Sequence, residues 1–423
     1  MTAKPHPRRI RRFRLRGNIR LLLLVLGPGL VSGFADNDAG GIATYSLAGA
    51  RFGYGLMWSL LVTMLALGIT QEAGARLGLA TGQGLAGLIR ERFGVRWTGF
   101  AVVVMLAANL GTIVAEFAGI AAALSLFGVA PQISSVLAAT FVIALVARAN
   151  FGPVQYAFLA VGLAVSVAYA VSAVLANPDW GHAAVASFVP ELQGSGVYIV
   201  TLVGVVGTTI TPWGQAFIQS YVADKGLGPR DLAAARLDVG LGSFLTNLVA
   251  AFIVVACAAT IWTHGGSIES AADAALALGP LAGQSATVIF GIGLLAASLL
   301  GLAVVPLTSA YFACEAFGWE SGVHWRWREA PVFYGLLAFF VGFSALFTII
   351  PGLPLIEVLF ATQVFNGLLL PIILTFVMLI SGDRQRLGAL AGGRVLQFLG
   401  WGITFLVSVM SAVYVLSQIF SWS

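Results

Sequence analysis

The sequence predicts an all-α polytopic membrane protein with about eleven transmembrane helices. Three observations support this prediction. Hydrophobic residues make up 59% of the 423 residues and charged residues only 9%, whereas a soluble domain carries about 25% charged residues. Apolar segments long enough to cross a bilayer as helices recur along the chain. They are not the short, alternating segments that are typical of a transmembrane β-barrel.

The apolar segments follow one another with short connections that contain Gly, Pro or charged residues, such as ANPDWGH, ADKGLGPR and SGDRQR. Residues 1–19 form a basic tail, and residues 20–423 form one transmembrane domain without an inserted soluble domain. No small-residue cleavage site follows the basic tail, so we expect the first span to be retained. The segments run roughly over 20–48, 54–77, 98–126, 131–148, 153–176, 197–222, 237–262, 283–314, 331–350, 354–380 and 395–420.

The distribution of Lys and Arg predicts the orientation of the chain. With the N-terminus in the cytoplasm and eleven crossings, every Lys and Arg except Arg51 falls on the cytoplasmic side. The C-terminus then lies outside the cell membrane. The net charge of +5 therefore belongs to one side of a bilayer, and we expect no nucleic-acid partner. The chain gives no prediction of oligomeric state.

The first span is interrupted by a polar sequence, GFADNDAGGI, at residues 33–42. A carboxylate at bilayer depth costs about 2.5–3.5 kcal/mol, and this stretch holds both Asp36 and Asp38 beside a glycine pair. Broken backbone at that depth is tolerated only where it faces protein or a water-filled cavity. The stretch therefore predicts a cation site near the middle of the membrane.

A second interruption lies in the sixth span, where GTTITPWGQ contains Pro212 and Gly214. Five spans separate the two interruptions, so the two halves of the chain have opposite orientations in the membrane. Paired broken helices in corresponding positions indicate the binding site of an inverted-repeat transporter. Either interruption alone is a weak signal, because Pro-kinked helices are common in membranes.

The chain resembles the NRAMP family of divalent metal transporters. The resemblance rests on GPGLVSGFADNDAGGIATYSLAGARFGYGLMWSLL, TQEAGARLGLATGQGLAGLIRERFG, VAEFAG, GLLAAS and TQVFNGLLLP. It implies a LeuT-type fold of two inverted five-helix repeats, at about 20–176 and 197–380, and one extra helix at about 395–420. Within the family, the chain looks most like the NRAMP-related magnesium transporters, a branch that also accepts Mn²⁺.

The resemblance also implies a set of ion ligands, and the chain departs from the family at several of them. The family carries Asp-Pro-Gly-Asn in span 1, and the aligned residues run from Asp38 to Gly41, so the metal-binding Asp is kept and the Asn is lost. In span 6 the Ala whose carbonyl binds metal becomes Thr208, and the Met becomes Thr211. The glutamine of span 10 is Gln363.

These departures remove the soft ligand and leave oxygen donors, which suit Mg²⁺, Mn²⁺ or Ca²⁺. We expect a partly hydrated Mg²⁺, and also Mn²⁺, to be the transported substrate, with no bound cofactor. Some candidates have a structural alternative: Asn37 as a turn residue, Thr211 bonded to its own helix, and Gln215 satisfying freed backbone groups. The candidate ion-site residues are Asp36, Asn37, Asp38, Gly41, Thr208, Thr211, Gln215 and Gln363.

Two further departures bear on proton coupling. Trp213 stands where the family has a His, and Ile113 stands for one of two acids in span 3, of which only Glu116 remains. A proton-linked carrier needs titratable groups along an internal path, so we expect uncoupled uptake by alternating access. Glu116 is expected in an internal polar network, with a proton path as the alternative.

Other functions remain as alternatives at this stage. One is a proton-coupled Mn²⁺/Fe²⁺ carrier, and another is an amino-acid carrier of the same fold, although two acids at the first break disfavour an anionic group there. A membrane enzyme is not favoured, because no span carries an HExxH or GxSxG motif. Glu72 and Arg76 should form a pair on one helix face, and Glu315 and Glu357, near span ends, should be solvated.

Overall fold

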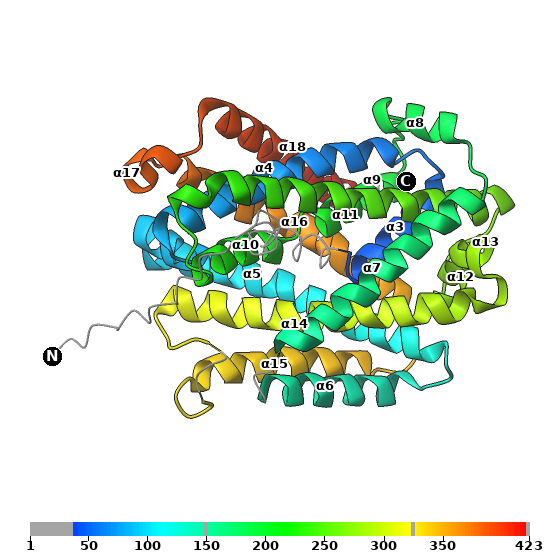
Figure 1. The fold of residues 1–423 in the computed structure, drawn as a ribbon, viewed down its shortest axis with the longest axis horizontal. Coiled ribbons are helices and arrows are strands. Elements are labelled where there is room, and N and C mark those ends of the chain that lie inside the picture. Colours follow the sequence, from blue (N-terminus) through cyan, green and yellow to red (C-terminus); the bar gives the residue numbers. More distant parts are fainter. Residues whose placement is uncertain (1–36, 148–150, 323–325, 420–423) are drawn as a thin grey trace, which may run out of the picture.

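The structure is a computed structural model that describes residues 37–147, 151–322 and 326–419. Within these ranges the chain is helical and contains no β-strand. The long helices lie lengthwise beside one another, with α8, α12 and α13 at one end of the bundle and α17 at the other (Figure 1). Asp36 and the residues before it lie outside the described ranges.

The first half of the chain contributes five helices, and all follow predicted apolar segments. Residues 37 and 38 are not helical, and α3 begins directly after Asp38, within the polar stretch where the sequence predicts the first interruption. α5 changes direction at Gly94, whose φ of 77° is not helical. The five helices are α3 (Ala39–Phe52), α4 (Met57–Thr81), α5 (Leu85–Ser125), α6 (Pro131–Ala147) and α7 (Phe151–Leu175).

The second half repeats this pattern, and its sixth predicted segment is divided into two helices. α9 ends at Thr209 and α10 begins at Pro212, so the predicted second interruption is confirmed. The remaining segments each form one helix within a few residues of the predicted bounds. The helices are α9 (Gly196–Thr209), α10 (Pro212–Asp224), α11 (Leu232–Thr260), α14 (Ala286–Phe317), α15 (Pro331–Thr348), α16 (Leu355–Ser381) and α18 (Arg394–Ile419).

Seven helices of the described residues are long and apolar enough to cross a membrane, and eight if the bent pair of α7 and α8 counts as one span. α4 is not among them, because polar residues such as Gln71, Glu72 and Arg76 occupy its second half. α6 is not among them either, because it has only 17 residues. Length and composition therefore mark fewer spans than the eleven apolar segments of the sequence.

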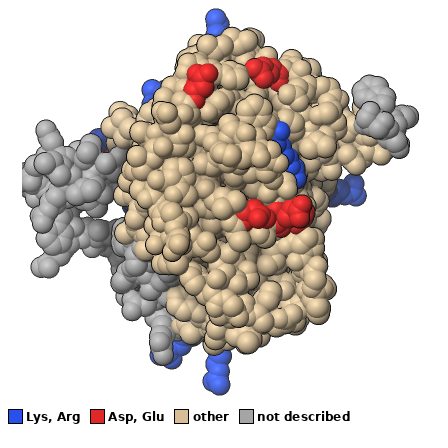
Figure 2. Space-filling view, turned by 90° about the vertical axis from the view of Figure 1, so that its right-hand side faces the viewer, with Lys and Arg blue, Asp and Glu red and all other residues tan. Residues whose placement is uncertain are grey.

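Short helices at the two ends of the bundle were not predicted. α8 (Trp180–Phe188), α12 (Ala271–Ala275) and α13 (Gly279–Ala282) lie at one end. The surface of that end is mostly uncharged, with a few acidic side chains (Figure 2). At the other end, α17 (Arg384–Leu387) follows the C-terminus of α16. These segments lie in stretches that the sequence presents only as connections.

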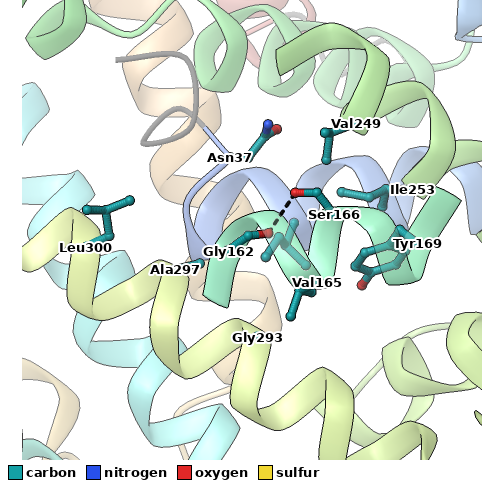
Figure 3. Close-up of a pocket in the computed structure, with 11 residues that line it drawn as sticks. Asn37, Gly162, Val165, Ser166, Tyr169, Val249, Ile253, Gly293, Ala297 and Leu300 are labelled. Atoms are coloured by element: carbon teal, nitrogen blue, oxygen red, sulfur yellow. Dashed lines mark hydrogen bonds between the residues drawn. The ribbon is translucent and has the colours of Figure 1, made fainter. Parts of the chain in front are cut away.

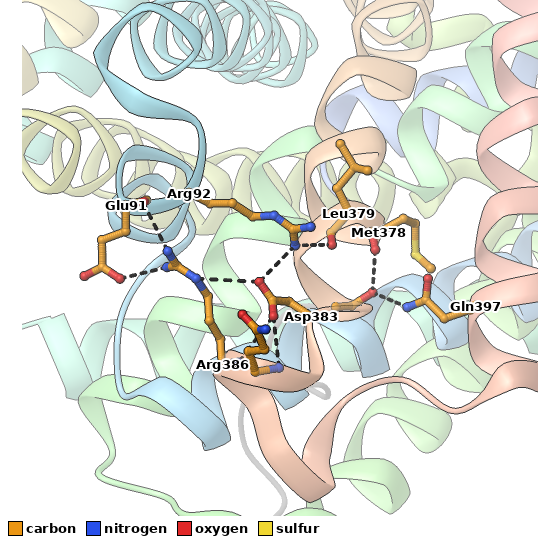
Figure 4. A network of polar contacts seen from close by, with 9 residues as sticks. Glu91, Arg92, Met378, Leu379, Asp383, Arg386 and Gln397 are labelled. Carbon is orange, nitrogen blue, oxygen red and sulfur yellow. Dashed lines mark hydrogen bonds and ion pairs between the residues drawn. The ribbon is translucent and has the colours of Figure 1, made fainter.

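The α17 end is held together by a network of charges (Figure 4). Arg386 of α17 contacts Glu91 of α5 at 3.0 Å, and Asp383 pairs with Arg92 at 3.4 Å. Arg92 also donates a hydrogen bond to the carbonyl oxygen of Leu379 on α16. The network therefore joins the N-terminal part of α5 to the C-terminal end of α16.

Glycines let several helices approach one another at backbone distance. A Cβ atom at Gly78 of α4 would lie 2.7 Å from the carbonyl oxygen of Gln219 on α10. A Cβ at Gly49 of α3 would lie 2.4 Å from the carbonyl oxygen of Val254 on α11. Close packing through small residues is a common source of helix association in membranes, and here it fixes both half-helices, α3 and α10, against long neighbours.

Candidate functional site

Asp38 is the N-cap of α3, and its two carboxylate oxygens have different surroundings. Oδ1 accepts a hydrogen bond from the backbone N–H of Gly41 at 2.7 Å, as a capping residue does. Oδ2 is buried and has no hydrogen-bond partner. The whole side chain is only 1% exposed. One oxygen therefore holds the helix, while the other is a buried acceptor available to a ligand.

Glu116, in the middle of α5, lies beside this carboxylate. Its side chain neighbours Asp38 and Ala39, and both of its oxygens are buried without a hydrogen-bond partner. The contact depends on two glycines. A Cβ at Gly119 would lie 2.4 Å from that of Ala39, and one at Gly301 of α14 would lie 2.3 Å from Oε1 of Glu116. The fold thus brings together two acids that are far apart in the sequence.

Gln363, on α16, lies between the two broken helices. Its side-chain Nε2 is 1.9 Å from the place where a Cβ of Gly40 would be, so a larger residue at position 40 would require the Gln363 side chain to move. The backbone carbonyl oxygen of Gln363 is likewise 2.1 Å from the place where a Cβ of Gly207, on α9, would be. The amide Oε1 accepts a hydrogen bond from Asn366 at 3.1 Å, whereas Nε2 is buried without a partner.

The second interruption places further oxygen atoms in the interior. Thr211 is the N-cap of α10, and its hydroxyl accepts from the N–H of Gly214 at 3.2 Å. The bond of Thr211 to its own helix, given above as an alternative to ion binding, is therefore present. Thr208 Oγ1 and both amide atoms of Gln215 are buried without hydrogen-bond partners, and both residues are 0% exposed.

A hydrogen bond joins the two half-helices on the α8 side of the interruptions. The hydroxyls of Tyr45, on α3, and Thr209, at the end of α9, lie 2.8 Å apart. Both side chains are fully buried. The bond lies one to two turns from Asp38 along α3, so it ties the two interrupted segments together close to the candidate site.

Asn37 faces a cavity on the other side of α3, between α3, α7, α11 and α14 (Figure 3). Its Nδ2 donates to the carbonyl oxygen of Thr246 at 3.4 Å, and its Oδ1 has no partner. The cavity measures about 20 Å³ and is lined mainly by apolar side chains such as Val165 and Ile253. It has room for about one water molecule, which is too little for a hydrated cation.

The residues at the two positions that bear on proton coupling are packed in an apolar cluster. Ile113 and Trp213 are both 0% exposed and belong to the same group of buried side chains, with Phe117 and Leu300. The Trp213 ring also contacts the ring of Phe217, with 5.9 Å between centroids. On this side of α10 the surroundings of the site are therefore hydrophobic.

Together, these contacts bring part of the predicted set into one region. Asp38 accepts a hydrogen bond from Gly41, and the Gln363 side chain packs against Gly40 of the same helix, α3. Thr208 follows Gly207, which packs on the backbone of Gln363. Asn37 faces the separate small cavity, and Asp36 lies outside the described residues. Among the described residues, no three His, Cys, Asp or Glu side chains cluster as metal ligands. Any cation here would be held by few carboxylates and several neutral oxygens.

Sequence reasoning treated two acids too simply. Glu116 was expected in a polar network, but its position beside Asp38 was not foreseen, because it depends on the packing of α3 against α5. Glu315 was expected to be solvated, but its side chain is only partly exposed and its Oε2 is buried. The predicted pair of Glu72 and Arg76 is confirmed at 2.8 Å, and Arg236 joins it at 2.7 Å.

Comparison with known proteins identifies a family. The Nramp profile, "Natural resistance-associated macrophage protein-like", matches residues 29–417. The divalent metal cation transporter MntH of Deinococcus radiodurans is 30% identical over 407 residues, which cover 93% of this chain and 89% of the relative.

Solved structures share the fold. The manganese transporter of Eremococcus coleocola, in complex with an aromatic bis-isothiourea substituted compound, gives a TM-score of 0.80 at 19% identity and covers 96% of this chain and 89% of its own. MhsT in complex with L-phenylalanine gives a TM-score of 0.57 at 16% identity, with 95% and 98% covered. The fold and the site thus define a multi-pass membrane protein of the LeuT type, with buried oxygen atoms where two helices are interrupted. The chain belongs to the Nramp family.

Proposed function

We propose that this protein carries divalent metal cations across the cell membrane by alternating access, with Mg²⁺ as the main substrate and Mn²⁺ as a second one. The observation that carries the proposal is the buried Oδ2 of Asp38, which has no hydrogen-bond partner at the start of a half-helix. A buried acceptor of this kind is costly unless a ligand satisfies it. The names of the family's relatives, as divalent metal and manganese transporters, support the same class of substrate.

The preference for Mg²⁺ rests on the chemistry of the donors. In the described part of the chain, the candidates around the interruptions offer carboxylate, amide, hydroxyl and carbonyl oxygens, with no thioether or imidazole among them. Oxygen donors suit hard cations, and Mg²⁺ typically keeps several waters while it binds one or two carboxylates. We infer that Asp38 and Asp36 hold the ion through its waters, with Thr208 and Thr211 nearby.

Gln363 would have to turn its amide in order to join the ligands. Its Nε2 now lies toward Gly40, and its oxygen accepts from Asn366. A cation attracts the oxygen and repels the NH₂ group, so binding would favour rotation of the amide by about half a turn. The hydrogen bond from Asn366 would then be lost, which makes Gln363 a ligand of the ion-bound state.

Transport would proceed without proton coupling and inward along the membrane potential. The hydrophobic packing of Ile113 and Trp213 supports this, because these are the positions where the chain departs from the family's titratable residues. The orientation that fits the charge distribution has α17 in the cytoplasm and α8 outside. Each positive charge gains about 2.3 kcal/mol per 100 mV of inside-negative potential.

A second candidate function is proton-coupled transport of Mn²⁺. One observation favours it: Glu116, a buried acid without a hydrogen-bond partner, lies beside Asp38. Such a group can hold a proton in one state of the carrier and release it in another. The two candidates differ in whether protons move with the metal.

Ion flux into proteoliposomes tests both candidates. The full chain is reconstituted, Mg²⁺, Mn²⁺ or Ca²⁺ is added outside, and a pH-sensitive dye is enclosed. We expect Mg²⁺ and Mn²⁺ to enter without internal acidification, and Asp38→Ala to abolish this entry. Metal entry with acidification that disappears in Glu116→Gln would favour the coupled carrier. Vesicles that stay closed to all three metals would contradict the proposed function.

A further inference from the structure

α10 carries two buried glutamines: Gln215, one of the candidate ion-site residues, and Gln219, one turn further from the interruption. Gln215 and Gln219 are four residues apart, so they lie on the same side of the helix, about 6 Å apart along its axis. Both are 0% exposed. Gln219 Oε1 is buried without a hydrogen-bond partner, as are both amide atoms of Gln215. A polar row therefore leads from the second interruption toward the α17 end of the bundle.

The row ends at a buried carboxyl, that of Glu315 near the C-terminus of α14. Its Oε2 is inaccessible and has no hydrogen-bond partner. The carboxyl lies directly on Gly84, where a Cβ would be only 1.8 Å from Oε2. A side chain at residue 84 would therefore occupy the space of the carboxyl. None of the ion pairs among the described residues includes Glu315.

Gln219 and Glu315 contact two adjacent residues of the same loop, Gln83 and Gly84. Gln219 Nε2 donates to the carbonyl oxygen of Gln83 at 3.0 Å, and the next residue along the chain is Gly84, which contacts Glu315. Ser220, beside Gln219 on α10, also contacts the Glu315 carboxyl. The Glu315 carboxyl, the Gln219 amide and the Ser220 hydroxyl thus lie around the loop before α5, and Gln219 Oε1 has no hydrogen-bond partner.

The guanidinium of Arg90, at the C-terminal end of α14, contacts a backbone carbonyl rather than Glu315. Arg90 donates through Nη1 to the carbonyl oxygen of Ala316 at 3.1 Å, so its charge is placed at the C-terminal end of α14. It satisfies a helix carbonyl, as basic residues commonly do at a helix C-terminus. The carboxylate of Glu315 thus has no ion-pair partner in the described chain, although a buried charge needs one.

We propose that Glu315, Gln219 and Ser220 form a second binding site for a divalent cation, at which the transported ion pauses on its way to the cytoplasm. The site rests on the proposed function for its substrate class. It lies about 12 Å along α10 from the interruption at Thr211. Its donors are all oxygens, like those of the central site, so both sites select hard cations.

Equilibrium binding of Mn²⁺ to the purified full chain tests this proposal, with free Mn²⁺ measured by electron paramagnetic resonance. We expect two ions per wild-type chain. Asp38→Ala should remove one and keep the other, and Glu315→Gln should keep the Asp38 ion while weakening the second by at least about tenfold, as when a partner of a bound metal is lost. Retention of the Asp38 ion shows at the same time that Glu315→Gln has folded.

Glu320→Gln is the matched control, because Glu320 is an exposed carboxylate five residues further on at the same end. It should bind two ions. If Glu315→Gln does not fold, Gln219→Leu replaces it, and it too should weaken the second ion. Two ions of unchanged affinity in Glu315→Gln or in a folded Gln219→Leu would overturn the inner site and leave the proposed function intact. A wild-type chain that binds only the Asp38 ion would overturn it as well.

Discussion

The two oxygens of Asp38 divide between the fold and the proposed ion site. Its Oδ1 caps α3 through the N–H of Gly41, and its Oδ2 is left buried and without a partner. The cap fixes the carboxylate in place, so the second oxygen needs no further ordering when a cation arrives. An Asp at this position is therefore both a helix start and a prepared acceptor.

Two substitutions separate these roles. Asparagine caps helices about as well as aspartate, whereas alanine does not. We expect Asp38→Asn and Asp38→Ala to reduce metal uptake by at least about 100-fold, because both remove the charge that attracts a dication. Only Asp38→Ala should also destabilise the protein, by about 1 kcal/mol. Uptake into proteoliposomes and thermal unfolding measure the two effects. Equal stability losses would contradict the capping role.

Thr211 is the residue at which metal preference can be changed. A thioether favours softer transition metals over hard cations. We expect Thr211→Met to raise uptake of Mn²⁺ relative to Mg²⁺ by about tenfold, equivalent to about 1.4 kcal/mol of preference. Thr211→Val removes the same hydroxyl without adding sulfur, and it should leave the ratio near that of the wild type. Competition between the two metals in one uptake assay gives the ratio directly. If both variants changed the uptake ratio equally, the cause would be the loss of the Thr211 cap rather than the added sulfur.

At the scale of the elements, glycines let the half-helices α3 and α10 pack closely on their neighbours, beside buried side chains such as Ile218 and Val222. α10 packs on α4 through Gly74 and Gly78, and α3 packs on α11 through Gly49. At Gly78 an added Cβ would meet both a backbone carbonyl oxygen and the Val222 side chain at 3.0 Å or less, so the contact has little room for a change in volume. The positions of α3 and α10 are therefore sensitive to single added methyl groups.

Gly78→Ala tests this packing. Its Cβ would lie 2.7 Å from the carbonyl oxygen of Gln219 and 3.0 Å from Val222, so α10 must shift. We expect a loss of about 1–3 kcal/mol in unfolding free energy and slower metal uptake. Gly99→Ala is the control, because Gly99 lies within α5 and nothing lies within 4 Å of its Cβ position. It should be neutral or slightly stabilising, since alanine is the better helix former. Thermal unfolding curves of the two variants measure this difference in stability.

The elements themselves follow from local sequence, and so does the second interruption. Pro212 has no backbone N–H to continue the hydrogen bonds of α9, and Thr211 before it is a good N-cap, so two adjacent residues determine the break. The neighbourhood of Glu116 and Asp38 is different. These acids are 78 positions apart, and only the packing of Gly119 on Ala39 brings them together. No local pattern signals such a contact.

Burial near helix ends was equally hidden from the sequence. Glu315 lies two residues before the end of α14, where a carboxylate is usually solvated. The loop before α5 covers it, because Gly84 has no side chain to keep α14 away. The short helices α8 and α12 were missed for a related reason: each is brief and capped by Asp179 or Ser270, within a stretch that reads as a connection.

At the scale of the whole molecule, the charge distribution bears on the proposed direction of transport. The α8 end shows a few acidic groups among mostly uncharged surface (Figure 2), whereas Arg92 and Arg386 lie at the α17 end (Figure 4). Acidic groups raise the local concentration of cations at the entrance. The membrane potential then acts on the ion throughout its passage.

The dependence on potential separates uncoupled from coupled transport. A dication gains about 4.6 kcal/mol on crossing 100 mV, twice the value for one charge. We expect an inside-negative potassium diffusion potential to accelerate Mg²⁺ uptake several-fold, with no change of internal pH. A pH-sensitive dye and a Mg²⁺ indicator inside the same vesicles record both. Uptake that ignores the potential but follows an imposed pH gradient would contradict the uncoupled mechanism.

The hydrogen bond between Tyr45 and Thr209 has a consequence for how the carrier changes state. It joins α3 and α9 deep in the interior, where water cannot replace a lost partner. The two helices should therefore swing as a single rigid arm, and the path on the α8 side should open in one step. Without this hydrogen bond α3 and α9 would move separately, and ions would leak through while only one of the two helices had moved.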